Sequence, residues 1–205
     1  MNPLNSRIYL ASQNPRYRES LAQIGVGFEM LLLRTDPRRE LAINDVQEAD
    51  ETVQHYLERI CCATVVAGQH ALVSRSLRAY PVLAADAILE TDGSAVGKPH
   101  DQKASADMLR ALSGRQHLLT SAVAVAFQAR VACRLTTTNI SFATLTDERI
   151  RRYVMANEGR DRAGAYAVEG LGGAFVSRIE GSHSALFGLP LFETVELLSE
   201  FDLSI

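Results

Sequence analysis

Three short segments between residues 83 and 117 hold side chains suited to phosphate chemistry. A short apolar run ends on Asp86, Lys98 stands between a glycine and a proline, and a small polar turn covers residues 113–117. A carboxylate can hold a metal ion or accept a proton from water, and a lysine can neutralise phosphate as a point charge. Together these residue types predict a site that handles phosphate groups.

A second polar cluster, residues 11–16, stands where a predicted strand meets a predicted helix. The first turn of a helix exposes backbone N–H groups and the positive end of the helix dipole, which favour anions. Arg16 adds a guanidinium fork that matches phosphate, and Ser12 adds a hydroxyl. We therefore expect Ser12 and Arg16 to bind substrate.

Each of these residues also has an ordinary structural explanation. Asp86 can be a capping or ion-paired residue at a strand end, Lys98 a solvated turn residue, and Arg16 a surface residue beside a helix cap. The polar turn at residues 113–117 favours a helix stop. His117 lacks a partner at metal-ligand spacing, so we expect a structural histidine.

Composition excludes several classes of protein. The chain has 205 residues, of which 47% are hydrophobic and 22% charged, so one domain or two small lobes can bury a core. A net charge of −3 gives no attraction to nucleic acid polymers or anionic membranes. Three cysteines, two of them adjacent, form no disulfide or zinc pattern. Without a long apolar segment, we expect a soluble, cytoplasmic protein.

Hydrophobic spacing and turn residues predict strands and helices in alternation, with one long hairpin in the middle. The predicted strands cover residues 7–11, 28–33, 82–85, 118–127, 131–143 and 174–179, with a short hairpin at Asp92-Gly93. The predicted helices follow Pro15 and cover residues 52–67, 101–112, 146–157 and 191–201. In the helix at 101–112, we expect Ala104, Met108, Ala111 and Leu112 to face inward. This order indicates an α/β or α+β fold with a mixed sheet.

Taken in order, these segments resemble the Maf family of nucleoside triphosphate pyrophosphatases, from about residue 7 to 201. The family's opening LAS-x-SPRR-x-ELL is similar to residues 10–21, and its ML-x-x-LSGR-x-H to residues 108–117. Its GADT…DG…GKP is similar to Ala85-Asp86-Ala87, Asp92-Gly93 and Gly97-Lys98-Pro99. Its D-K-AGAYGIQG and IDG…GLP are similar to residues 161–170, 179–181 and 188–190.

The resemblance implies a fold, a reaction and roles for residues. The fold would be α/β, with a mixed twisted sheet, flanking helices and two lobes around a central cleft, related to inosine-triphosphatase-like folds. Residues 1–205 would form one Maf-like domain, in a homodimer. The reaction would split a nucleoside triphosphate into the monophosphate and pyrophosphate with a divalent cation (Mg²⁺, Mn²⁺ or Co²⁺). The proton acceptor, also a metal ligand, falls on Asp86, and the phosphate contacts fall on Arg16 and Lys98.

At the positions that select the base in the family, this chain matches neither of two known sets of residues. Family members that act on dTTP and UTP resemble an Arg, Thr, Gln set, whereas those acting on 7-methyl-GTP resemble a set with Glu in the last place. This chain has Arg16, Ala87 and Glu169, which fits neither set. Glu169 stands in the glycine-rich segment 164–173 and can accept a hydrogen bond from a base. The family resemblance also implies a modified or non-canonical nucleotide as a plausible substrate.

Other departures from the family pattern leave two further hypotheses open. The family's second serine, second arginine, one of an acidic pair and a helix lysine are replaced by Asn14, Tyr17, Pro37 and Thr64. These changes leave fewer side chains that could bind phosphate or a metal ion than the family pattern has. The chain could therefore be a catalytically weakened nucleotide-binding regulator of the same family, or an interaction protein that acts through its surface.

Overall fold

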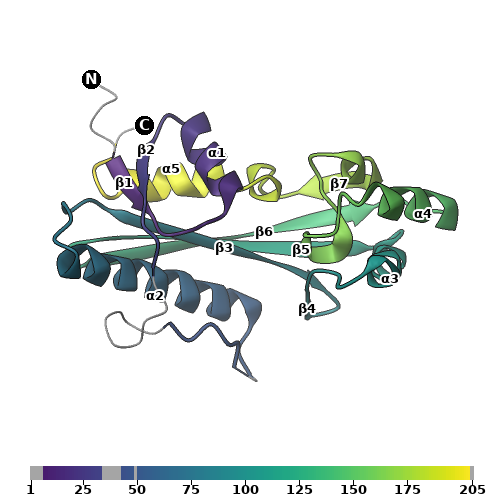
Figure 1. The fold of residues 1–205 in the computed structure, drawn as a ribbon, viewed down its shortest axis with the longest axis horizontal. Coiled ribbons are helices and arrows are strands. Elements are labelled where there is room, and N and C mark those ends of the chain that lie inside the picture. The colour runs from purple at the N-terminus through teal and green to yellow at the C-terminus, as the bar shows by residue number, and fades with distance from the viewer. Residues whose placement is uncertain (1–6, 34–42, 49, 204–205) are drawn as a thin grey trace. The chain divides into compact units, whose positions relative to one another are not determined.

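The computed structural model describes residues 7–33, 43–48 and 50–203, which form a mixed sheet with flanking helices (Figure 1). In the described residues the sheet has seven strands in the order β2-β1-β3-β5-β6-β7, with β4 paired to β3. Strand β1 pairs in parallel with β2 and β3, whereas β4 and β7 are antiparallel to β3 and β6. The strands are β1 (Arg7–Leu10), β2 (Gly27–Met30), β3 (Val82–Thr91), β4 (Ser94–Val96), β5 (Gln116–Phe127), β6 (Arg130–Phe142) and β7 (Val176–Glu180). The predicted α/β fold with a mixed sheet is confirmed.

Most of the helices begin at side chains that cap them. Asn14, Thr52, Asp101 and Thr146 each accept a hydrogen bond from a backbone N–H of the following helix's first turn. The α-helices are α1 (Pro15–Gln23), α2 (Val53–Ser74), α3 (Gln102–Leu112), α4 (Asp147–Ala156) and α5 (Leu191–Ser199). Within the described part of the chain, no helix has the length and apolarity to cross a membrane.

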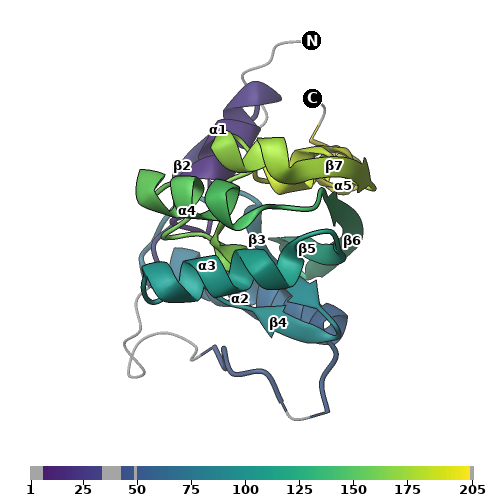
Figure 2. The same cartoon turned by 90° about the vertical axis from the view of Figure 1, so that its right-hand side faces the viewer.

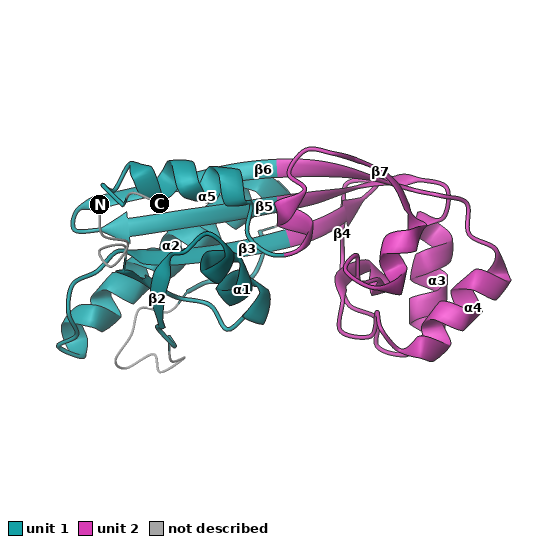
Figure 3. Ribbon diagram, turned by 90° about the horizontal axis from the view of Figure 1, so that it is seen from above, with its two compact units in different colours: residues 1–87, 121–136, 188–205 teal, residues 88–120, 137–187 magenta. Residues whose placement is uncertain are grey.

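The chain divides into two compact units (Figure 3). Unit 1 contains residues 1–87, 121–136 and 188–205, and unit 2 contains residues 88–120 and 137–187. Strands β3, β5 and β6 each contribute residues to both units. The description of residues 1–205 as one domain stays a prediction.

In unit 1, helices cover both faces of the strands. Figure 1 shows α1 and α5 on one face and α2 on the other. Leu21 of α1 and Leu197 of α5 pack with Leu10, Leu83 and Val123 of the strands in one buried cluster. On the opposite face, α2 buries an apolar stripe along its length: Val53, Leu57, Ile60, Cys61, Val65, Ala67, Ala71 and Leu72.

Helix α2 is longer than its sequence pattern predicts. The prediction ends it at Ala67, but the helix continues to Ser74 and keeps Ala71 and Leu72 buried. Gly68, the first residue beyond the predicted range, allows close packing. A Cβ at Gly68 would lie 2.7 Å from Val82 Cγ1, so only glycine lets the helix approach β3 this closely.

Unit 2 packs α3 and α4 side by side (Figure 2). Leu109 and Leu112 of α3 join Ile150 and Tyr153 of α4 in a second buried cluster. The predicted inward face of α3 was partly wrong. Leu112 is buried as predicted, and Ala104 and Met108 are half-buried, but Ala111 is exposed. The other fully buried residues of α3 are Ser105 and Leu109.

The short hairpin predicted at Asp92-Gly93 is confirmed. Asp92 has a φ of 51° and Gly93 a φ of 75°, and β3 and β4 pair on either side of them. Two consecutive residues with positive φ define the turn that matches the twist of a two-residue hairpin. The prediction for residues 28–33 was only partly right, since β2 covers Gly27–Met30.

Candidate functional site

Asp86 lies inside β3 rather than at the end of a strand, which corrects the sequence-based expectation. The strand continues to Thr91 because Leu89, Glu90 and Thr91 pair with β4. Asp86 is an exposed residue whose carboxylate is partly desolvated by the protein around it, and its Oδ1 accepts a hydrogen bond of 2.8 Å from the backbone N–H of Ala87. Ala87 itself is half-buried.

The surroundings of Asp86 keep its carboxylate basic. Desolvation by the surrounding protein raises the pKa of Asp86, although the Ala87 N–H lowers it. Its negative charge acts on three weakly acidic groups, Tyr17 of α1 and Tyr56 and Cys61 of α2, and adds to the effect of burial in raising the pKa of each. A carboxylate with a raised pKa beside neutral groups is suited to accept a proton.

The start of α1 lies on the same side of unit 1 as Asp86. Strands β1 and β3 are parallel, with Leu10 opposite Leu83, and the Ala11 N–H donates to the Leu83 carbonyl at 2.8 Å. Because the two strands run in the same direction, both continue past this pair toward the same edge of the sheet. There β1 leads into residues 12–16, and β3 leads to Asp86. The structure thus brings Ser12, Arg16 and Asp86 to one region of unit 1.

Short-range hydrogen bonds organise residues 12–16. The Asn14 side chain accepts from the Arg16 N–H at 3.1 Å, and Ser12 Oγ accepts from the Asn14 N–H at 3.2 Å. Pro15 is the first residue of α1, where its fixed φ suits a helix. Arg16 is half-buried in the first turn, where the positive end of the helix dipole favours a phosphate group.

The positions that depart from the family pattern have structural roles. Tyr17 is buried in the core of unit 1. The Thr64 hydroxyl donates to the Ile60 carbonyl at 2.7 Å, within its own helix. On α2 it is Tyr56 and Cys61 whose pKa values Asp86 affects. Helical periodicity alone did not indicate these two residues, because it does not show which strand a helix packs on. Residues 36–39, the altered acidic pair and its two arginines, lie outside the described residues.

Lys98 and Glu169 belong to unit 2, in two segments that meet there. Lys98 is exposed in the loop after β4, and the neighbouring Gly97 carbonyl accepts from the Gly164 N–H at 3.1 Å. Glu169 forms an ion pair of 2.7 Å with Arg162. The backbone contact joins the loop of Lys98 to the glycine-rich segment that carries Glu169.

Glu158, which the sequence analysis did not single out, braces the glycine-rich segment. Its carboxylate accepts from the backbone N–H groups of Leu171 and Gly172 at 3.0 and 3.1 Å and from the Tyr153 hydroxyl at 3.1 Å. Desolvation alone would raise the pKa of Glu158, but these hydrogen bonds lower it. The Tyr153 hydroxyl in turn accepts from the Ala167 N–H at 2.9 Å.

His117 has the structural role that the sequence predicted. Its ring is 2% exposed, hydrogen-bonds with the Tyr166 hydroxyl at 2.8 Å and meets Phe142 edge to face. Burial lowers the pKa of His117 to about 4, so the ring is neutral at pH 7. Cys61 is buried in α2, as expected, with its Sγ 3.9 Å from the Ala122 carbonyl.

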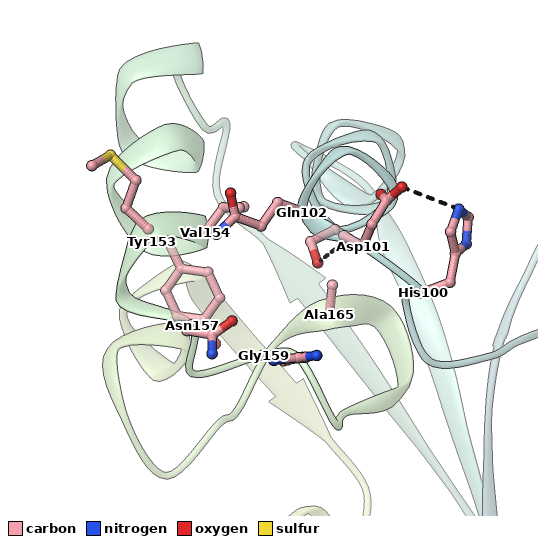
Figure 4. Close-up of a pocket in the computed structure, with 11 residues that line it drawn as sticks. His100, Asp101, Gln102, Tyr153, Val154, Asn157, Gly159 and Ala165 are labelled. Atoms are coloured by element: carbon pink, nitrogen blue, oxygen red, sulfur yellow. Dashed lines mark hydrogen bonds and ion pairs between the residues drawn. The ribbon is translucent and has the colours of Figure 1, made fainter.

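Unit 2 also has a pocket of about 530 Å³ (Figure 4), which contains none of the predicted site residues. Its lining comes from the start of α3, the end of α4 and the segment between Gly159 and Ala165. Some of its polar groups already have partners. Asp101 caps α3 through the Ala104 N–H and pairs with His100 at 3.4 Å.

The fold and site define an α/β protein in which a strand carboxylate, Asp86, acts electrostatically on the first turn of the helix that carries Arg16. The family model described as Maf-like protein matches residues 7–201, and the chain belongs to this family. A relative from Aromatoleum aromaticum, named dTTP/UTP pyrophosphatase, is 42% identical over 98% of both chains. A relative of the same name from Escherichia coli K12 is 42% identical over 95% of this chain and 93% of that protein.

One Shigella flexneri relative carries a broader name, nucleoside triphosphate pyrophosphatase. It is 42% identical over 95% of this chain and 93% of its own length. Among solved structures, the Staphylococcus aureus Ham1 protein aligns with a TM-score of 0.43 and 14% identity, over 67% of this chain and 72% of that one.

Proposed function

We propose that this protein is a nucleoside triphosphate pyrophosphatase, which hydrolyses a nucleoside triphosphate to the monophosphate and pyrophosphate. Relatives with that activity in their names match nearly its whole length. The observation that carries the proposal is the exposed, only partly desolvated carboxylate of Asp86 in the region of unit 1 where α1 begins.

In this proposal Asp86 accepts a proton from the attacking water. The water oxygen forms a bond to the α-phosphorus while the bond from that phosphorus to the bridging oxygen breaks, and pyrophosphate leaves with the bonding electrons. Arg16 and the positive end of the α1 dipole offset negative charge on the phosphates. For Lys98 as a second phosphate contact, and for Ser12 as a substrate contact, the support is the sequence resemblance.

The residues present fit a divalent cation that arrives with the nucleotide. In the parts of the chain that the structure describes, no three His, Cys, Asp or Glu side chains cluster as a metal site. Asp86 is exposed and offers one carboxylate. This fits Mg²⁺, because that ion is commonly bound by one or two carboxylates together with substrate phosphates and waters. When bound, Mg²⁺, Mn²⁺ or Co²⁺ would offset charge on the phosphate oxygens.

We propose dTTP and UTP as the first substrates to test, because they appear in the relatives' names. Ala87 and Glu169 are the positions we expect to modify the choice of base, toward a modified or non-canonical nucleotide. We also propose that the protein works in the cytoplasm on free nucleotides, not on nucleic acid polymers or membranes, and forms a homodimer. Light scattering after size-exclusion chromatography would test the homodimer.

The test is a nucleotide panel with each of the three cations, followed by phosphorus NMR and by mass analysis in ¹⁸O-labelled water. The panel holds the common nucleoside triphosphates, dTTP, inosine triphosphate and 7-methyl-GTP. We expect pyrophosphate as the product and ¹⁸O in the monophosphate, because water attacks the α-phosphorus. Release of orthophosphate and a diphosphate would reject the reaction. Tight calorimetric binding without turnover would favour the regulator hypothesis.

A further inference from the structure

Cys62 of α2 and Cys133 of β6 place their thiols within hydrogen-bonding reach of each other in unit 1. Both thiols are free and half-buried. The alternation of β6 agrees with this contact. Ala132 packs against the buried cluster that contains residues of α1 and α5, so Cys133 points to the other face. That face is the one that α2 covers (Figure 1).

We propose that Cys62 and Cys133 form a disulfide when the protein meets hydrogen peroxide, and that this bond joins α2 covalently to β6. The Cys62 sulfur attacks the peroxide O–O bond and becomes a sulfenic acid, and the distal oxygen leaves as water after protonation. The Cys133 sulfur then attacks the Cys62 sulfur, the S–S bond forms, and the sulfenic oxygen leaves as a second water. The two thiols lose two electrons in total, and the peroxide gains them.

The surroundings of the three cysteines predict which sulfur reacts first. The hydrogen bond from Cys133 lowers the pKa of Cys62, whereas that hydrogen bond and then burial raise the pKa of Cys133. The thiolate is the nucleophile, so Cys62 attacks and Cys133 resolves. Glu58 opposes ionisation of both thiols, as a smaller effect. Cys61 does not compete, because burial, followed by the charge of Asp86, raises its pKa.

The bond would form beside the proposed base. Cys61 precedes Cys62 in α2, and its pKa responds to the charge of Asp86. A covalent link at Cys62 would therefore restrain the part of α2 nearest to Asp86. Any effect on turnover depends on the proposed function, whereas formation of the disulfide does not.

The experiment treats the reduced full chain with hydrogen peroxide in slight molar excess, then alkylates it with N-ethylmaleimide and maps peptides by mass. We expect alkylated thiols to fall from the three of the sequence to one, since two are consumed, and dithiothreitol to restore all three. A peptide linking Cys62 to Cys133 should appear in the wild-type protein and in Cys61→Ala, and be absent from Cys62→Ser and Cys133→Ser.

Three results would overturn the proposal: sulfinic acid at Cys62 without a linked peptide, a link that uses Cys61, or a link between two copies of the chain. The mapping of wild-type protein decides the matter even where a serine variant folds poorly. Because the readout is thiol chemistry, an inactive protein in the nucleotide panel would leave this result unaffected.

Discussion

Tyr17 of α1 and Asp86 of β3 are electrostatically coupled. Burial raises the pKa of the Tyr17 phenol, and the negative charge of Asp86 raises it further. This coupling links the helix that carries Arg16 to the strand that carries the proposed base. It also leaves Asp86 beside a neutral phenol, so the carboxylate keeps the raised pKa that desolvation gives it.

The raised pKa of Asp86 predicts a stability cost at neutral pH. The folded protein holds the proton more tightly than the unfolded chain, whose Asp has its ordinary pKa of 3.8. Stability therefore falls as pH rises from about 4 through the folded-state pKa, and stays lower above it. We expect Asp86→Asn to unfold at higher urea than wild type at pH 7, with the gap closing toward pH 4. An equal gap at both pH values would contradict this.

Arg16 and Arg18 form a matched pair for testing phosphate binding. Both are in the first turns of α1, but Arg16 is half-buried and Arg18 is exposed. We expect Arg16→Ala to lower kcat/KM by roughly tenfold to a hundredfold, the loss of about 1.5–3 kcal/mol of charge-assisted hydrogen bonding. Arg18→Ala should stay within about twofold. Steady-state kinetics on the best nucleotide measures both, and equal losses would remove the special role of Arg16.

Alanine substitutions at Gly164 and Gly93 separate two costs of an added side chain in unit 2, backbone strain and steric overlap. Both have a positive φ, of 69° and 75°, so alanine at either position costs about 1–2 kcal/mol. A Cβ at Gly164 would also lie 2.5 Å from Leu89 Cδ2, whereas nothing lies within 4 Å of one at Gly93. We expect Gly164→Ala to cost about 1–3 kcal/mol more than Gly93→Ala in urea unfolding. Equal costs would show that the Leu89 side chain moves aside at little cost in free energy.

The lowered pKa of His117 predicts that the folded protein loses stability in mild acid. Its pKa is about 4 in the folded protein against 6.5 ordinarily, so the unfolded chain takes up the proton first. Stability contributed by the neutral ring is complete above about pH 6.5 and is lost as pH falls toward 4, by roughly 3 kcal/mol. We expect His117→Gln to flatten this decline, and His70→Gln, an exposed residue of α2, to leave it unchanged. Unfolding midpoints across pH 7 to 4.5 measure it.

The sequence predicted features that depend on a few neighbouring residues. The helices predicted after Pro15 and from residue 146 begin at Asn14 and Thr146, and Asp92-Gly93 makes its turn, because local hydrogen bonds and backbone angles decide these structures. The sequence-based prediction failed where tertiary packing decides the length of an element. Helix α2 continues past Gly68, where Val82 leaves no room for a side chain, and nothing near Gly68 in the sequence shows this contact.

The same limit applies to the candidate site. Ser12, Arg16 and Asp86 could be singled out because their residue types suit phosphate chemistry. Tyr56 and Cys61 could not, because an apolar helical stripe looks the same whichever strand it covers. Asp86 was misplaced at a strand end because the pairing of β3 with β4, which extends the strand, involves residues after it.

The most direct test of the account is the turnover of Asp86→Asn compared with Glu29→Gln, an exposed carboxylate on β2 of the same unit. If Asp86 accepts the proton from water, its amide variant should lose about 10²- to 10⁴-fold in kcat on the best nucleotide, with an unchanged circular dichroism spectrum. Glu29→Gln should retain wild-type kcat. Turnover of Asp86→Asn within a few-fold of wild type would contradict the central claim.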